Sequence, residues 1–260
     1  MSLAKAIGIG FLVLILLGLA LAVINYMNQP PQPYLAMNIP SGFTYNGPDT
    51  SALAAWYCIA SINSSNGYSI QLNAELGNGE WVQDSYIVPP NGQSGFNVNV
   101  WSSSTSSVTA KFVPANANCA WLVITIKGGY ANVGYSLDGK NVIWYASYPV
   151  GATYIIPDAS GQTNLVVAGF AYGLQAQLGR GTLVYLALYY WNGTDWAPAS
   201  IKTIQGLEGT LETVNHAWIF TRGSCGGYVA WFGWNKTDWT TPVLPPNLEP
   251  VCPGSPSFKP

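Results

Sequence analysis

The chain has 260 residues, of which 49% are hydrophobic and 8% are charged, about a third of the ~25% charged residues usual in soluble proteins. Nine Lys and Arg residues stand against eleven Asp and Glu residues, and no basic cluster offers nucleic acid a site, which excludes that class of partner. Eleven Trp, 16 Tyr and 8 Phe residues can bury far more apolar surface than a disordered chain carries. The sequence therefore predicts a folded protein that uses few charges.

The first 27 residues predict a single transmembrane helix. Residues 6–24 carry no charged or polar side chain, and a helix of this length spans about 28 Å, close to the hydrocarbon thickness of a bilayer. Lys5 is the one cation that flanks the segment, so we expect the remaining chain on the extracellular side of the membrane. A cleavable signal peptide is the alternative, because Ala20-Leu21-Ala22 forms an A-x-A site, and the protein would then be secreted. We favour the anchor because the apolar run continues beyond this site.

Proline content divides the rest of the chain into three parts. Residues 28–33 read NQPPQP and predict a stiff spacer that holds the body away from the bilayer. Residues 34–241 form the predicted body. Residues 242–260 carry seven prolines, which exclude a helix or a paired inner strand. We expect this tail to wrap around the surface, held by Cys252.

Four cysteines follow the predicted anchor: Cys58, Cys119, Cys225 and Cys252. An even number in an exported chain predicts two disulfides, for which three pairings exist. We expect the first two cysteines to pair with each other, and the last two likewise. Zinc binding requires closely spaced pairs such as C-x-x-C, which are absent, so we expect no metal.

Three N-x-[ST] sequons predict an exported surface that carries glycans. They are Asn63, Asn192 and Asn235. Each triplet is short enough to occur by chance, so the sequons support the extracellular placement without establishing it.

The body is predicted to be all-β, because strand signals recur about every ten residues and no helical period is sustained. The clearest signal is 69–76, where apolar and polar residues alternate. Its hairpin partner is expected at 80–88, after a turn at Gly77-Asn78-Gly79. The remaining expected strands are 54–62, 96–101, 119–127, 133–137, 141–146, 165–170, 183–191, 216–221 and 228–234. This number suits a large β-sandwich, either one or two in tandem. The Ser102–Ser107 run is interpreted as a loop.

The length of the first hairpin turn decides which face of the sheet carries Asp84. A two-residue turn places Asp84 opposite Asn73 on the polar face, beside Gln71 and Glu75. A three-residue turn places Gln83 opposite Asn73 and moves Asp84 to the buried face. The sequence leaves both alternatives open.

Most familiar catalytic motifs are absent. His216 is the sole histidine, and no G-x-S-x-G, Gly-rich nucleotide loop or H-E-x-x-H is present. We therefore expect no cofactor. Carboxyl groups remain, and acid hydrolysis of peptides requires one to activate water and a second carboxyl or an amide to polarise the scissile carbonyl.

Several segments resemble thermopsins, the acid peptidases of thermoacidophilic archaea. Ser69-Ile70-Gln71-Leu72-Asn73 followed by Trp81-Val82-Gln83-Asp84 is similar to their QLN…WVQ signature, and 186–193 (LALYYWNG) is similar to their central strand and turn. Residues 209–214 (GTLETV) occupy the place of a DTAET-like stretch. The resemblance spans residues 50–220 and implies a β-rich body that works at low pH. The scarcity of charged residues agrees with a low working pH, because the carboxyl groups of Asp and Glu are mostly neutral below their pKa values of ~4.

The candidate catalytic residues follow from this resemblance. They are Glu212, Asp84, Gln71 and Gln83. Glu212 is retained from the DTAET-like stretch, whereas Gly209 replaces its Asp and Asp84 replaces an amide. The chain is therefore expected to be an acid endopeptidase with a polypeptide substrate, or an inactive descendant. A Gln and Glu pair would match glutamic peptidases, which use these two residues on a β-sandwich.

Two other functions belong to different classes. The aromatic content and the departures from the thermopsin pattern are also typical of a non-enzymatic module of an archaeal envelope, surface filament or virion, with protein partners. Strips of Trp and Tyr on a sandwich can also bind carbohydrate.

Overall fold

The computed structural model describes residues 41–64, 67–103, 106–157, 163–169, 182–204, 217–221, 227–232 and 253–260. The chain falls into two compact units, residues 1–33 and 34–260, and every described residue belongs to the second. Glu212, Cys225, Cys252 and Asn235 lie outside the described ranges, as do residues 6–24. Within those ranges, no helix is both long and apolar enough to cross a bilayer.

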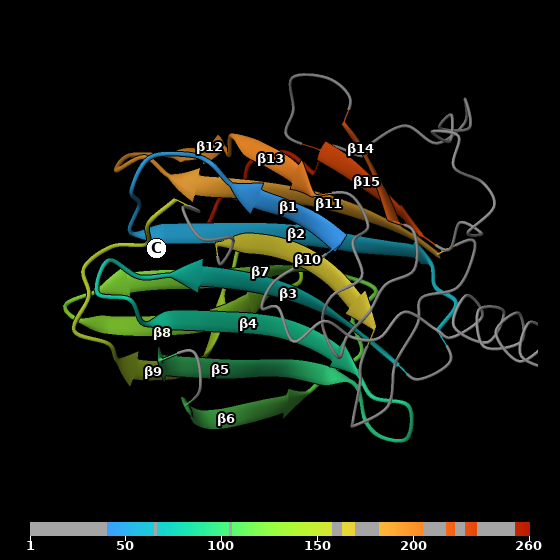
Figure 1. The fold of residues 1–260 in the computed structure, drawn as a ribbon, viewed down its shortest axis with the longest axis horizontal. Helices are drawn as coiled ribbons and strands as arrows, with labels where there is room; N and C mark the ends of the chain where they lie inside the picture. Colours follow the sequence, from blue (N-terminus) through green and yellow to red (C-terminus); the bar gives the residue numbers. More distant parts are fainter. Residues whose placement is uncertain are drawn as a thin grey trace, which may run out of the picture. The chain divides into compact units, whose positions relative to one another are not determined.

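The described chain folds into two antiparallel sheets that form one sandwich (Figure 1). The seven-stranded sheet has the order β13 (Ile201–Ile204), β1 (Ser41–Tyr45), β10 (Asn164–Gly169), β3 (Tyr68–Glu75), β4 (Trp81–Val88), β5 (Gly95–Ser103), β6 (Ser106–Pro114). The other sheet has the order β14 (Ala217–Thr221), β15 (Gly227–Phe232), β11 (Thr182–Trp191), β2 (Ala52–Ser61), β7 (Cys119–Lys127), β8 (Tyr130–Ser136), β9 (Ile143–Pro149), with β12 (Trp196–Pro198) paired to β11. The all-β prediction is confirmed, and both sheets belong to one sandwich.

A single core fills the space between the sheets. Alternation along β3 directs Ile70 and Leu72 inward, and alternation along β7 directs Leu122 and Ile124 toward them from the other sheet. All four side chains are fully buried. The core also contains aromatic residues, and Tyr57 of β2 stacks on Tyr86 of β4 with ring centroids 5.5 Å apart. The sandwich is therefore held together by interdigitated apolar side chains from both sheets.

A smaller apolar cluster covers the outer face of the eight-stranded sheet. Trp121 of β7, Tyr189 of β11 and Trp196 of β12 contribute to it, and so does Phe258 near the end of the sequence. Within Pro253–Pro260, the part of the tail that the structure describes, Phe258 thus lies against this outer face.

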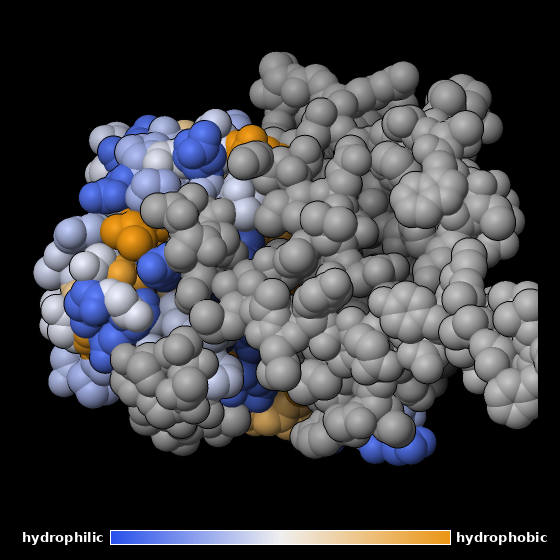
Figure 2. Space-filling view, in the orientation of Figure 1, coloured by the Kyte–Doolittle hydropathy of each residue, from blue (hydrophilic) through white to orange (hydrophobic). Residues whose placement is uncertain are grey.

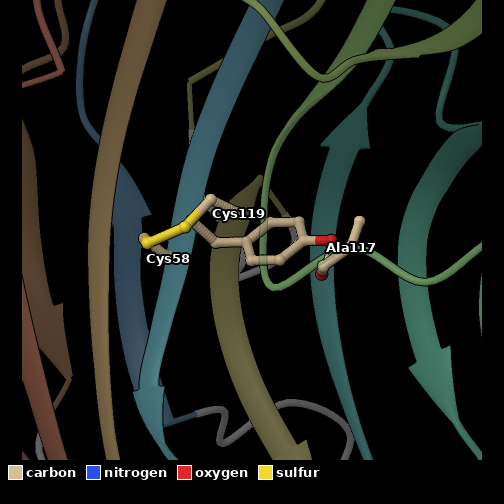
Figure 3. Close-up of a disulfide and its surroundings, with 4 residues drawn as sticks. Cys58, Ala117 and Cys119 are labelled. Carbon is tan, nitrogen blue, oxygen red and sulfur yellow. Dashed lines mark hydrogen bonds between the residues drawn. A yellow bond between two sulfur atoms is a disulfide. The ribbon is translucent and has the colours of Figure 1, made fainter.

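The predicted disulfide between Cys58 and Cys119 is present. The two cysteines lie directly opposite each other on the neighbouring strands β2 and β7 (Figure 3). The hydroxyl of Tyr57, the residue before Cys58, donates a hydrogen bond of 3.1 Å to the carbonyl of Ala117, which precedes β7. The disulfide thus joins two central strands of the eight-stranded sheet.

The prediction of a loop over Ser102–Ser107 is wrong at both ends of the run, where the residues belong to strands. β5 continues to Ser103 and β6 begins at Ser106, and these two serines pair with each other. Main-chain hydrogen bonds to a neighbouring strand form whatever the side chain, so a serine-rich run can extend a hairpin. Strands β1, β6, β12 and β13 were also not expected from the sequence. All four lie at or near sheet edges, and all except β6 are short.

Large apolar side chains on the described surface are scattered. The described surface visible in Figure 2 is mostly hydrophilic, with small separate apolar areas. The exposed large apolar residues are Phe112, Tyr130, Leu137, Ile143, Trp144 and Tyr154. Several lie on or beside β9, an edge strand of the eight-stranded sheet.

Candidate functional site

Polar side chains gather on the outer face of the seven-stranded sheet, away from the core. Alternation along β3 places Gln71 and Asn73 on this face, because Ile70 and Leu72 point into the core. In the observed register Asn73 lies opposite Gln83 of β4, and Gln83 lies opposite Asn99 of β5. On the other side of β3, Asn73 lies opposite Asn164 of β10. Four neighbouring strands thus bring carboxamide side chains together.

These carboxamides form one hydrogen-bonded network, which we call the amide ladder: Asn164, Asn73, Gln71, Gln83 and Asn99. Nδ2 of Asn73 donates to Oδ1 of Asn164 at 2.8 Å. Nε2 of Gln83 donates to Oε1 of Gln71 at 3.1 Å and to Oδ1 of Asn73 at 3.0 Å. Nδ2 of Asn99 donates to Oε1 of Gln83 at 2.8 Å, and Nε2 of Gln71 donates to Oγ of Ser69 at 2.8 Å. The ladder crosses the sheet from β10 to β5.

Gln83 is the central member of the ladder, with both amide hydrogens donated and its oxygen accepting. Gln71 and Asn73 beside it are 8% and 6% exposed. Shielding from water strengthens such hydrogen bonds and makes an unmade one costly. The amide orientations are therefore fixed, as a site that must position a substrate carbonyl requires.

A second row of side chains lies next to the ladder on the same face. Glu75 lies opposite Trp81, and Trp81 lies opposite Trp101. The two indole rings are stacked, with centroids 4.9 Å apart and planes 5° from parallel. Nε1 of Trp101 is buried and has no hydrogen-bond acceptor among the described residues. The face therefore combines fixed amides, a carboxyl group and an aromatic pair.

Asp84 lies on the opposite face of β4, fully buried between the two sheets. Its carboxyl group accepts hydrogen bonds from the hydroxyl of Tyr145 at 2.7 Å and from the N–H of Val123 at 3.0 Å. Burial raises the pKa of Asp84 well above its ordinary value, although the hydrogen bonds from Tyr145, Val123 and Ser85 oppose the shift. Of the two registers left open by the sequence, the one with Gln83 opposite Asn73 is therefore observed.

The structure thus brings together two of the four candidate catalytic residues and separates a third. Gln71 and Gln83 are joined by a hydrogen bond on the outer face. Asp84 faces the core, where it cannot act with them on one substrate. Glu212 lies outside the described residues.

Two of the three sequon asparagines lie within the described ranges, and both Asn63 and Asn192 are exposed. Oδ1 of Asn192 accepts hydrogen bonds from the N–H groups of Thr194 and Asp195, at 2.9 and 2.8 Å. These bonds close the turn between β11 and β12. Within the described part of the chain, no group of three or more His, Cys, Asp or Glu side chains could hold a metal ion.

Sequence reasoning missed Asn99 and Asn164 as members of the ladder. Asn99 could have been found, because Asn97 and Asn99 alternate with buried Phe96, Val98 and Val100 along β5. Asn164 carries no local signal. It reaches Asn73 because β10 pairs with β3, and the two residues are far apart in sequence.

Comparison with known proteins finds similarity among solved structures alone. No family model matches the chain, and no curated protein matches it. A scytalido-glutamic peptidase with a transition state analog inhibitor is similar at 8% identity and a TM-score of 0.47, over 75% of this chain and 98% of that one. SCP-B, a member of the eqolisin family of peptidases in complex with the tripeptide Ala-Ile-His, gives 10% identity and a TM-score of 0.41, over 74% of this chain and 96% of that one. A functionally unknown protein from Saccharomyces cerevisiae gives 15% identity and 0.32, over 58% of this chain and 76% of that one. None of these values assigns the chain to a family.

Proposed function

We propose that the protein is an acid endopeptidase that binds an extended polypeptide on the outer face of the seven-stranded sheet. The observation that carries the proposal is the fixed pair Gln71 and Gln83 within the amide ladder. These two residues belong to the QLN and WVQ segments that resemble thermopsins. Residues 6–24 would anchor this body at the outer surface of a membrane, as the sequence predicts.

In the proposed reaction, Gln71 polarises the scissile carbonyl, and Glu212 acts first as general base and then as general acid. The Glu212 carboxylate takes a proton from a water molecule, whose oxygen attacks the carbonyl carbon. An amide hydrogen of Gln71 stabilises the negative charge that develops on the carbonyl oxygen. Glu212 then gives the proton to the leaving nitrogen as the carbon–nitrogen bond breaks. Gln83 orients Gln71, because both of its own amide hydrogens are donated within the ladder.

The length of the chain allows Glu212 to reach this face. Ile204, the last residue of β13, lies in line with Gly42, Val166 and Gln71 across four neighbouring strands. Three strand spacings separate Ile204 from Gln71, roughly 14 Å. Eight residues lead from Ile204 to Glu212 and span up to about 26 Å. The proposed pair is therefore compatible with the described topology.

The test is cleavage of an unstructured protein by the purified chain across acid and neutral pH. We expect cleavage in acid, and a loss of at least ~100-fold in kcat/KM for Glu212→Gln and for Gln71→Ala. Gln93→Ala is the control, because Gln93 is exposed in a loop away from the ladder. Unchanged cleavage by Glu212→Gln would remove Glu212 from the mechanism. Absence of cleavage by a folded, disulfide-intact chain would reject the proposal.

A non-enzymatic interaction module of an envelope, filament or virion is the second candidate. The observation that favours it is the position of Asp84 in the core, away from the ladder face. Among the described strand residues, Glu75 is then the one residue on that face with a carboxyl group. Such a module would associate with protein partners or with itself. The cleavage assay discriminates, because cleavage of protein in acid is expected from the first proposal alone.

A further inference from the structure

Phe258 inserts its ring among aromatic residues on the outer face of the eight-stranded sheet. The ring is 6% exposed. Its centroid lies 5.6 Å from that of Trp196, at an interplanar angle of 77°, and 6.1 Å from that of Trp121, at 86°. Both contacts are edge-to-face, the geometry that aromatic pairs favour. Phe258 is therefore the apolar anchor of the tail.

The residues around Phe258 are held in place by one another. Trp121 packs on Tyr189 with centroids 5.6 Å apart, and Trp191 packs on Trp196 with centroids 5.5 Å apart. Tyr189 and Trp191 lie on β11, and Trp196 lies on β12, which pairs with β11. We call these four residues the tail site. The walls of the site are thus formed by residues of the sheet strands β7, β11 and β12.

The tail meets this site as an extended peptide ligand would. Pro256 and Phe258 are buried, whereas Ser255, Ser257 and Lys259 between and beside them are exposed. The tail forms no strand within the described ranges. Nε1 of Trp196 donates to the carbonyl of Phe258 at 2.7 Å, and the N–H and hydroxyl of Ser257 donate to the carbonyl of Gly139 at 2.8 and 3.1 Å.

These contacts reproduce the chemistry by which aromatic surfaces recognise Pro-containing peptides. Such surfaces stack against the anchors of an extended segment, and an indole N–H donates to a peptide carbonyl. Proline on either side of the anchor, at Pro256 and Pro260, lowers the entropy lost on binding. The described tail is thus a short ligand that is covalently attached to its own site.

We propose that the tail site binds Pro253–Pro260 of a second copy of the chain, linking one copy's tail to the next copy's site. Every copy carries both the ligand and the site, so the contact is heterologous and can continue into rings or linear assemblies. Attachment to the same chain favours the intramolecular contact at low concentration. High local density, as on a membrane surface, favours exchange between copies. This proposal does not depend on peptidase activity.

Complementation between two full-length variants tests the exchange. Phe258→Ala leaves the site intact but removes the anchor, whereas Trp196→Ala keeps the tail but removes one wall and the donor of the site. We expect each variant alone to be monomeric by native mass spectrometry. An equimolar mixture is expected to form heterodimers at concentrations of order 100 µM, because each variant supplies what the other lacks. A mixture that stays monomeric would overturn the proposal.

A peptide measurement keeps the proposal falsifiable if Trp196→Ala fails to fold. Binding of the synthetic peptide PGSPSFKP to the Phe258→Ala chain is measured by titration calorimetry. The peptide PGSPSAKP is the matched control. We expect the Phe peptide to bind at least tenfold more tightly than the control, because the anchor ring buries most of the apolar surface. Equal or absent binding of the two peptides by a folded chain would overturn the site itself. If Phe258→Ala does not fold, the Phe258→Leu chain is used instead. The Phe peptide is again expected to bind more tightly than the control peptide.

Discussion

Tyr145 donates its hydroxyl hydrogen to the carboxyl group of Asp84 at 2.7 Å, which joins β9 of one sheet to β4 of the other through the core. No described charged residue is among the buried neighbours, and the other titratable residues in this region are Tyr57, Tyr68, Tyr86, Tyr135 and Tyr148. Asp84 is therefore accommodated without a buried counter-charge. The protonated form suits such a position, because it removes the cost of burying a charge.

Folding stability is predicted to fall as pH rises because of Asp84. Burial raises the pKa of Asp84 in the folded state, whereas the unfolded chain keeps an ordinary value of about 3.9. Below pH ~4 both states hold the proton, and the stability is fully present. Between the two pKa values the folded state holds more protons, so the free energy of unfolding falls by up to about 1.4 kcal/mol per pH unit.

Chemical denaturation of the wild type and of Asp84→Asn, from acid to neutral pH, checks this prediction. Asparagine has nearly the shape of a protonated aspartic acid and does not titrate. We expect the decline in stability above pH ~4 to be much smaller in the variant. Glu75→Gln serves as the control, because Glu75 is only partly buried and lies on the outer face. If Asp84→Asn keeps the full slope, another group is responsible.

Tyr145→Phe is predicted to destabilise the protein and to extend the pH-dependent loss of stability to higher pH. Loss of the hydroxyl leaves the buried carboxyl group without one of its donors, which costs about 1–3 kcal/mol. The same hydrogen bond stabilises the carboxylate, so its removal raises the pKa of Asp84 further. A double-mutant cycle with Asp84→Asn measures the coupling. Additive effects of the two substitutions would show that the pair does not act as a unit.

Much of the fold was predictable because the strands alternate and the turns contain Asn-Gly or Asp-Gly. Gly79 adopts a positive φ value of 83° at the predicted turn, and Gly139 adopts one of 69° between the predicted strands 133–137 and 141–146. The face that carries Asp84 was not predictable, because it depends on one residue of turn length. The N–H of Gly79 donates to the carbonyl of Leu76, and the N–H of Leu76 donates to the carbonyl of Glu80, which fixes the longer turn. That one-residue shift exchanges Gln83 and Asp84 between the two faces.

The amide ladder illustrates a second limit of sequence reasoning. Gln71 and Gln83 were named as candidates because their QLN and WVQ segments resemble thermopsins, and they meet because both lie on one hairpin. Asn164 joins them through the pairing of β10 with β3, which no local pattern encodes. Cross-strand contacts between distant segments depend on the topology of the whole sheet. A network that spans several strands is therefore only partly visible in the sequence.

Gln83→Glu is predicted to be tolerated in acid and destabilising near neutral pH. Ionised glutamate has no hydrogen to donate, so the bonds to Gln71 and Asn73 would both be lost and acceptors would face each other. Protonated glutamic acid can still donate one hydrogen. We expect the loss of stability to be about 1–3 kcal/mol larger at neutral pH than at pH ~3. Thermal unfolding at both pH values measures the difference.

Gln93→Glu makes the same chemical change at an exposed loop position and is the matched control. Its effect is expected to be small at both pH values. An equal pH dependence in the two variants would mean that the hydrogen bonds of the ladder do not contribute to stability. A neutral-pH loss confined to Gln83→Glu would support the donor role assigned to this residue.

Removal of the Cys58–Cys119 disulfide is predicted to lower the free energy of unfolding by about 2–4 kcal/mol. The bond closes a chain segment with a sequence separation of 61 residues, so it restricts the unfolded chain strongly. The folded chain keeps β2 and β7 paired through their main-chain hydrogen bonds, so we expect the double variant Cys58→Ala/Cys119→Ala to fold. Its denaturation midpoint is compared with that of the wild type, with and without reductant. Because the predicted Cys225–Cys252 disulfide would also respond to reductant, any further loss in the reduced double variant reports on that second pair. A double variant as stable as the wild type would contradict a stabilising role for the bond between β2 and β7.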